Sequence, residues 1–174
     1  MSSPAMVPEI DRQVAVDADD LPDQSALVGW VAGVLSRHPG ETRHELTVRF
    51  VDAAESQCLN RDYRHRDRPT NVLSFPFECP PGVDLPLLGD LVICHSVVSD
   101  EAGHQHKTVQ DHYAHMVVHG TLHLLGYDHI EDAEAEDMEA LERTILAEMG
   151  IADPYASPDP RTDDNDSEDE RANA

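Results

Sequence analysis

Apolar residues recur along the chain with two different periods, which predict strands and helices in alternation. Leu46, Val48 and Phe50 are spaced two apart, the period of a half-buried strand. In 25–37 the apolar residues fall on one face of a helix instead, and Ser25 is expected to cap its N-terminus. The same reasoning predicts strands at 8–16, 45–52 and 70–77, and a buried strand within 90–98 that runs into a turn or short helix. Helices are predicted at 25–37, 53–64 with Asp52 as its cap, 108–125 and 132–149.

This order of elements predicts an α/β (α+β) fold, in which a mixed β-sheet of about four strands is packed with several helices. Pro76 predicts an edge position or a strand end for 70–77. We divide the chain into an N-terminal segment at 1–24, with a first strand at 8–16, and a single domain at 25–152. The residues 153–174 form an acidic tail that should be disordered, because it has almost nothing to bury.

Charge is distributed unevenly over the 174 residues, whose formal net charge is −23. Residues 131–149 carry eight acids and one arginine, and 157–174 carry seven acids and two arginines, which together supply about half of that charge. Nucleic acid binding depends on Lys and Arg, so the average composition disfavours it. A local cluster weakens that objection, since four arginines stand within eight residues: Arg61, Arg64, Arg66 and Arg68.

The sequence also indicates where the protein is located and whether its cysteines form disulfides or bind metal. No apolar run approaches the roughly 18 residues of a membrane span, and the N-terminus lacks the basic and apolar regions of a signal peptide. A cytoplasmic protein without membrane contact is expected. The three cysteines form no C-x-x-C pair, so they suggest neither a disulfide framework nor a thiolate zinc site.

A histidine motif within HMVVHGTLHLLGYDH provides the candidate chemistry. His119 and His123 are four residues apart in the helix predicted at 108–125, so both rings project from one face and can bind one ion. Gly126 should end the helix in a left-handed conformation and reverse the chain. His129 then lies within reach of the same ion. Three imidazoles leave a fourth zinc position open, as catalytic sites do.

This spacing is that of the metzincin peptidases, H-E-x-x-H-x-x-G-x-x-H, with one departure. Gly120 stands where those enzymes have the glutamate that serves as general base. A metallopeptidase is therefore disfavoured, although an acid from elsewhere in the fold could replace the glutamate. A non-catalytic, ribosome-associated factor with a structural metal also stays open, and it predicts a fourth protein ligand.

Residues around the motif are given structural roles. We expect His115 to pack beside the ligands or to support them, since it lies too far along the helix to join the three. Three further histidines are expected at the surface: His104, His106 and His112. The helix at 132–149 should support the site from the core while exposing its acids, and four of its residues should be buried: Met138, Leu141, Ile145 and Met149.

Three segments together resemble the bacterial YbeY family of metal-dependent endoribonucleases that act in ribosomal RNA maturation. They are HGTLHLLGYDH at 119–129, LNRDYRHRDRPTNVLSFPFE at 59–78 and LGDLVIC at 88–94. The similarity covers roughly residues 40–150. It implies a mixed sheet with helices, one zinc ion, and cleavage of single-stranded RNA in 16S rRNA 3′-end maturation and ribosome quality control. It further implies contact with the small ribosomal subunit or its assembly factors.

Carried over residue by residue, the family's ligands fall on His119, His123 and His129, and its functionally important arginine falls on Arg64. These four are the candidate catalytic residues. A zinc ion lowers the pKa of water that it binds to about 7, and a guanidinium can hold two oxygens of the attacked phosphodiester. Three imidazoles also suit nickel, copper or iron. The acidic helix should repel RNA, so the substrate is expected to approach from the arginine side with salt-sensitive affinity.

Overall fold

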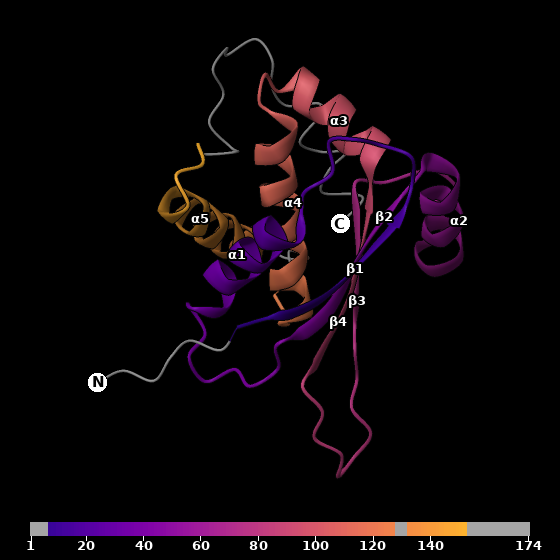
Figure 1. Ribbon diagram of the computed structural model, residues 1–174. Coiled ribbons are helices and arrows are strands. Elements are labelled where there is room, and N and C mark those ends of the chain that lie inside the picture. The colour runs from indigo at the N-terminus through magenta and orange to yellow at the C-terminus, as the bar shows by residue number, and fades with distance from the viewer. Residues whose placement is uncertain (1–6, 128–131, 153–174) are drawn as a thin grey trace.

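The computed structural model describes residues 7–127 and 132–152, and within them it forms a four-stranded mixed sheet (Figure 1). The strand order is β1-β2-β4-β3. Strands β1 (Glu9–Ala15), β2 (Glu45–Val51) and β4 (Leu87–Cys94) are parallel, whereas β3 (Val72–Pro76) is antiparallel to β4. The predicted mixed sheet of about four strands packed with helices is confirmed. His129 and the tail at 153–174 lie outside the described residues.

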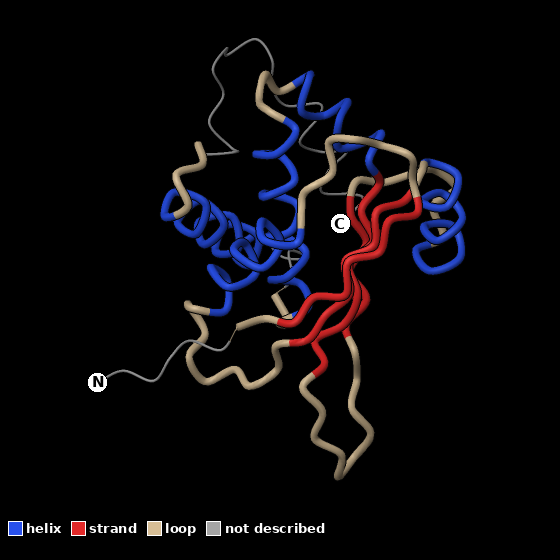
Figure 2. Tube along the Cα trace, viewed as in Figure 1, coloured by secondary structure: helices blue, strands red, loops and turns tan. Residues whose placement is uncertain are grey.

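Helices cover both faces of this sheet, as Figures 1 and 2 show. One face packs against α1 (Gln24–Leu35) and α4 (Val109–Leu124), and α5 (Asp132–Glu148) packs on those two helices. The other face is covered in part by α2 (Ala53–Arg64), while α3 (His95–His104) follows β4 directly. The main core joins the sheet to α1 and α4 through fully buried side chains such as Leu27, Phe50, Leu91, Ile93 and Tyr113.

Side-chain caps fix where the helices begin. The Asp52 carboxylate accepts a hydrogen bond from Glu55 N at 2.9 Å and so fixes the start of α2. The helix spans Ala53–Arg64, the bounds that the sequence predicts. Thr108 caps α4 in the same way, accepting from Asp111 N at 3.1 Å. The prediction of Ser25 as the cap of α1 was wrong: Asp23 caps that helix and accepts from Ala26 N at 2.8 Å. A carboxylate caps a helix as well as a hydroxyl does, and the helix begins at Gln24, directly after Asp23.

Strand β3 lies at the edge of the sheet, as Pro76 predicted. Its residues pair with β4 alone, in the register that joins Ser74 to Leu91, and Pro76 is its last residue. A proline is tolerated there because the side of the strand away from β4 needs no ladder hydrogen bond. This strand also contacts α4.

Within residues 7–127 and 132–152, none of the helices combines the length and apolar character that crossing a membrane requires. The three cysteines are free thiols, with Cys94 buried, Cys79 half-buried and Cys58 exposed.

Candidate metal centre

Helix α4 carries the candidate ligands on a scaffold that is buried along most of its length. His119 and His123 are half-buried, while most of the intervening and preceding side chains have little or no exposure. The two rings meet edge to face with centroids 4.6 Å apart, and their Nε2 atoms are 3.1 Å apart. The spacing of four residues therefore brings both imidazoles to one point, as predicted.

The helix ends in a glycine reversal that the sequence also predicts. Gly126 has a φ of 106°, and Tyr127 N donates across the turn to Leu122 O at 3.0 Å. This is the hydrogen bond of a Schellman motif, in which a glycine follows the last helical turn. The reversal places the carbonyl oxygen of Tyr127 2.9 Å from Nδ1 of His123. The turn thus orients one of the two imidazoles.

The tautomers of the two rings follow from their partners. A carbonyl oxygen only accepts, so Nδ1 of His123 carries the proton that it donates to Tyr127 O. Nδ1 of His119 lies 3.1 Å from Oε2 of Glu142 and donates to that carboxylate. In neutral rings both Nε2 atoms then carry lone pairs, and these face each other at 3.1 Å. A cation, either a proton or a metal ion, is needed between them.

The separation of the two nitrogens suits a metal ion. Two nitrogens that each lie 2.0–2.1 Å from one tetrahedral zinc ion are about 3.3 Å apart, close to the 3.1 Å between these Nε2 atoms. Histidine ligands of metals characteristically donate their other N–H to a carboxylate or a backbone carbonyl. His119 and His123 do one of each, so the described residues fit a bound metal ion.

Glu142 of α5 is a site residue that the sequence analysis missed. Its side chain has no exposed surface, and its carboxylate accepts from His119 Nδ1 and, at 2.8 Å, from His115 Nε2. Burial alone would raise the pKa of Glu142, but the two imidazoles hold it below its ordinary value. Burial lowers the pKa of His115 to about 4, so that ring is a neutral donor at neutral pH. The predicted supporting role of His115 agrees with this contact.

Two expectations about neighbouring residues were wrong. The acids of α5 are not all exposed, because Glu142 lies one turn from Met138 and from Ile145 on the buried face. His112 is not a surface residue either: it is fully buried, and its Nε2 lies 2.8 Å from Oε1 of Glu101. Hydrogen-bonding partners allow each polar side chain to be buried: two imidazoles for Glu142 and a carboxylate for His112. The partners come from other helices, which local periodicity does not reveal.

Arg64, the last residue of α2, lies at the free edge of β3. Its Nη2 donates to the carbonyl oxygen of Ser74 at 3.3 Å. The hydroxyl of Ser74 in turn donates to the carbonyl oxygen of Gly120, which stands between the two histidines in α4, at 3.4 Å. Arg64 and the histidine pair are thus connected through one residue of the edge strand, although they are more than 50 positions apart in the chain.

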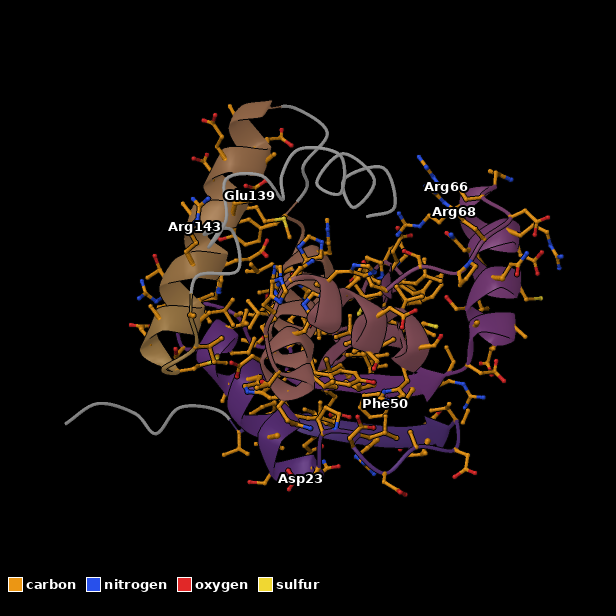
Figure 3. The ribbon with its side chains drawn as sticks, turned by 90° about the horizontal axis from the view of Figure 1, so that it is seen from above. Asp23, Phe50, Arg66, Arg68, Glu139 and Arg143 are labelled. Carbon is orange, nitrogen blue, oxygen red and sulfur yellow. The ribbon has the colours of Figure 1, made fainter. Side chains whose placement is uncertain are left out.

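Figure 3 shows how charge is arranged around these elements. Helix α5, with Glu139 and Arg143 labelled, lies on one side of α4, and α2 with the following Arg66 and Arg68 lies on the other. Arg61 forms ion pairs with Asp62 (3.4 Å) and Asp67 (3.9 Å), which offset its charge. Arg64, Arg66 and Arg68 add further basic side chains to this side.

Gly120 is required by packing. A Cβ built on it would lie 2.7 Å from Cδ2 of Leu91, a fully buried residue of β4, and 3.3 Å from Oγ of Ser74. Because Gly120 has no Cβ, α4 can approach the sheet closely. The residue that replaces the metzincin glutamate thus faces the sheet, and a longer side chain there would clash with Leu91.

Replacing Gly120 with alanine should lower the free energy of unfolding of the metal-free protein by about 1–3 kcal/mol, because buried Leu91 has little room to move. Alanine ordinarily stabilises a helix by up to about 1 kcal/mol relative to glycine. Gly29 of α1 is the matched control, since a Cβ there meets nothing within 4 Å, and Gly29→Ala should stabilise the protein. Chemical denaturation measures both. Equal stabilisation by the two substitutions would contradict the packing argument.

A second group of metal-binding side chains lies at the start of β1 and β2. Glu9, His44 and Glu45 place ligand atoms within 4.8 Å of one another, and the three residues are exposed or half-buried. The sequence analysis did not single them out, because parallel pairing of Glu9 with Glu45 brings together residues far apart in the chain. This group offers an alternative location for an ion, and it is distinct from the histidine pair.

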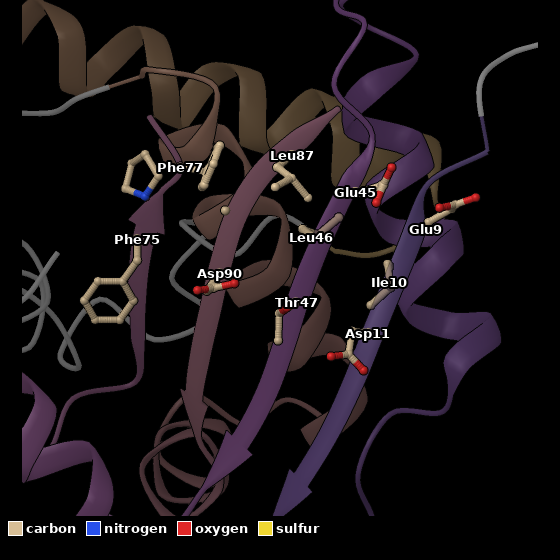
Figure 4. A pocket seen from close by; sticks show the side chains of 12 residues that line it. Glu9, Ile10, Asp11, Glu45, Leu46, Thr47, Phe75, Phe77, Leu87 and Asp90 are labelled. Carbon is tan, nitrogen blue, oxygen red and sulfur yellow. The ribbon is translucent and has the colours of Figure 1, made fainter. Parts of the chain in front are cut away.

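An open groove of about 470 Å³ runs across the sheet beside that group (Figure 4). Four acids line it, together with Phe75 and Phe77: Glu9, Asp11, Glu45 and Asp90. Neither histidine of the pair is among its lining residues. A groove with this charge repels a phosphate backbone.

Three comparisons with known proteins show what this chain is similar to. Residues 13–150 match the family model described as Endoribonuclease YbeY. A protein of Chromohalobacter salexigens named Endoribonuclease YbeY is 67% identical over 153 residues, which cover 87% of this chain and 99% of that protein. The solution structure of TM1509 from Thermotoga maritima is 25% identical, covers 87% of this chain and 98% of its own, and has a TM-score of 0.49.

The chain belongs to the YbeY family. The resemblance inferred from the three sequence segments is therefore confirmed.

Proposed function

We propose that this protein is a zinc-dependent endoribonuclease specific for single-stranded RNA, with one ion held by His119, His123 and His129. The observation that carries the proposal is that the Nε2 atoms of His119 and His123 face each other. Each ring donates from Nδ1 to an acceptor, so each Nε2 carries a lone pair. His129 enters through its spacing in the sequence. The name of the Chromohalobacter relative supports the reaction class.

Each residue has a separate task in this proposal. A zinc ion bound there would act as a Lewis acid and would lower the pKa of water, so that hydroxide is available as a nucleophile near neutral pH. His119 and His123 hold their lone pairs toward the ion because Glu142 and the Tyr127 carbonyl fix their Nδ1 protons. Arg64 offers N–H donors to the phosphodiester oxygens on which negative charge develops in the transition state.

Ribosomal RNA is the proposed substrate, with cleavage at the 3′ end of 16S rRNA and in ribosome quality control in the cytoplasm. Family membership supports this role. The small ribosomal subunit or its assembly factors would then be the partners. The arginines that follow α2 would bind the RNA backbone, so affinity should fall as salt concentration rises.

Incubation of zinc-loaded protein with single-stranded and duplex RNA of the same sequence tests the proposal. We expect internal cleavage of the single strand, little cleavage of the duplex, loss of activity after chelation and its return when zinc is added. Cleavage that survives complete removal of metal would contradict the proposed mechanism. Digestion of unstructured polypeptide but not RNA would favour a peptidase instead, and binding of RNA without cleavage would favour a non-catalytic ribosome-associated factor.

A further inference from the structure

Tyr63, in the last turn of α2, presents an aromatic ring to solvent. It is 64% exposed, and it is the only aromatic residue among the exposed large apolar residues in the part of the chain that the structure describes. The other four, Val7, Val14, Val83 and Leu85, are aliphatic. A single exposed aliphatic side chain is ordinary at a protein surface. An exposed ring beside clustered arginines has a more specific use.

The ring of Tyr63 is held in place from below. It meets the ring of Phe75 edge to face, with centroids 5.1 Å apart and an interplanar angle of 71°. Phe75 is half-buried and belongs to the apolar cluster between the sheet and α2. An aromatic side chain has only two rotatable bonds, so a ring supported in this way loses little conformational entropy when a ligand stacks on it.

Charges around Tyr63 suit a nucleotide. Arg64 follows it directly, and its guanidinium donates to Ser74 O, next in sequence to Phe75. His65 caps the C-terminus of α2 with a φ of 60°. The backbone then stays beside the helix end, because Arg66 N donates to Asn60 O and the Asn60 side chain donates to Arg68 O. The two aspartates of the same segment, Asp62 and Asp67, contact Arg61, and Asp67 also accepts from Gln57 at 3.0 Å.

We propose that Tyr63 and Arg64 form a nucleotide-binding subsite, in which an unpaired base stacks on the Tyr63 ring while Arg64 contacts the adjoining phosphate. This proposal rests on the proposed function and deepens it, because it gives a reason for selecting single strands. A base within a duplex has both faces covered by its neighbours, whereas an unpaired base offers a face to an aromatic ring. Stacking tolerates any base, so the subsite selects strandedness and not sequence.

Binding of fluorescently labelled oligouridine to the metal-free protein, measured by anisotropy, tests the subsite without cleavage. Tyr63→Ala should weaken binding by roughly 5- to 150-fold, and Tyr63→Phe should retain it, because the face of the ring is preserved. A second probe has the same phosphate backbone but lacks bases. It should bind the wild type weakly and show less than about a 2-fold difference between wild type and Tyr63→Ala, since there is nothing to stack. Val83→Ala, which removes an exposed apolar side chain elsewhere, should bind both probes as the wild type does.

Two outcomes would overturn the subsite. In the first, Tyr63→Ala binds oligouridine as tightly as the wild type does. In the second, Tyr63→Ala weakens the binding of both probes by the same factor, which would indicate a disturbed arginine cluster. Either can occur while the wild type still cleaves single-stranded RNA, in which case the proposed function stands. A wild type that neither binds nor cleaves RNA would overturn the proposed function itself.

Discussion

Replacing Arg64 with alanine is expected to lower kcat for RNA cleavage by roughly 100- to 1000-fold, the loss typical of removing one donor that stabilises transition-state charge. KM should change much less, because the neighbouring arginines still attract the RNA backbone. Nη2 of Arg64 donates to Ser74 O, and the hydroxyl of Ser74 donates to Gly120 O, which lies between the two histidines. These hydrogen bonds hold the guanidinium near the histidine pair. Steady-state kinetics on a short single-stranded substrate separates the two parameters.

Arg66→Ala is the matched control for that substitution. Arg66 is exposed and makes no ion pair or side-chain hydrogen bond with any residue of the described ranges. Its loss should raise KM and reduce the salt dependence of binding while kcat stays nearly constant. Arg64→Lys should recover little of the lost kcat, since an ammonium cannot hold two phosphate oxygens in a fork. A pure KM effect at Arg64 would contradict the role that we assign to it.

Glu142→Gln is expected to weaken zinc binding by about 10- to 100-fold, the usual effect of losing the group that orients a histidine ligand. Glutamine has nearly the same shape, but only its oxygen accepts. Its amide nitrogen would meet Nδ1 of His119 or Nε2 of His115, both of which donate to the carboxylate. If His119 changes tautomer to accept from the amide, its Nε2 gains a proton and loses the lone pair that faces His123.

Stability of the metal-free protein provides a second measurement for Glu142. A buried donor left unpaired destabilises by about 1–3 kcal/mol, so Glu142→Gln should lower the free energy of unfolding by that amount. Glu136 is exposed on the same helix, and Glu136→Gln should change stability by no more than about 0.5 kcal/mol and leave zinc affinity unaltered. Wild-type zinc affinity in Glu142→Gln would show that the carboxylate does not set the tautomer of His119.

Local features of the sequence predicted much of the fold and the core of the site. The bounds of α2 follow from the Asp52 cap and the end of helical periodicity, and both are present in the structure. The pair His119 and His123 depends only on the helical repeat, and the reversal at Gly126 depends on the freedom of glycine at positive φ. These features are determined by neighbours a few residues away, so one sequence is enough to find them.

Features that depend on tertiary contacts were missed. Glu142 is an acid in an acidic helix, and acids are almost never fully buried unless they are paired. Its spacing from Met138 and Ile145 is the one local signal that places it on the buried face. Gly120 was interpreted as a lost catalytic base, whereas its close approach to Leu91 depends on how α4 packs on the sheet. The cluster of Glu9, His44 and Glu45 likewise depends on strand pairing.

Zinc titration of the metal-free protein and three single variants tests the central claim most directly, because the structure offers two places for an ion. We predict one tightly bound zinc ion per wild-type chain. His119→Ala and His123→Ala should lose this tight binding, whereas His44→Ala should retain it. Loss of tight binding in His44→Ala, with retention in the other two variants, would place the ion at the strand ends and contradict a metal centre on α4.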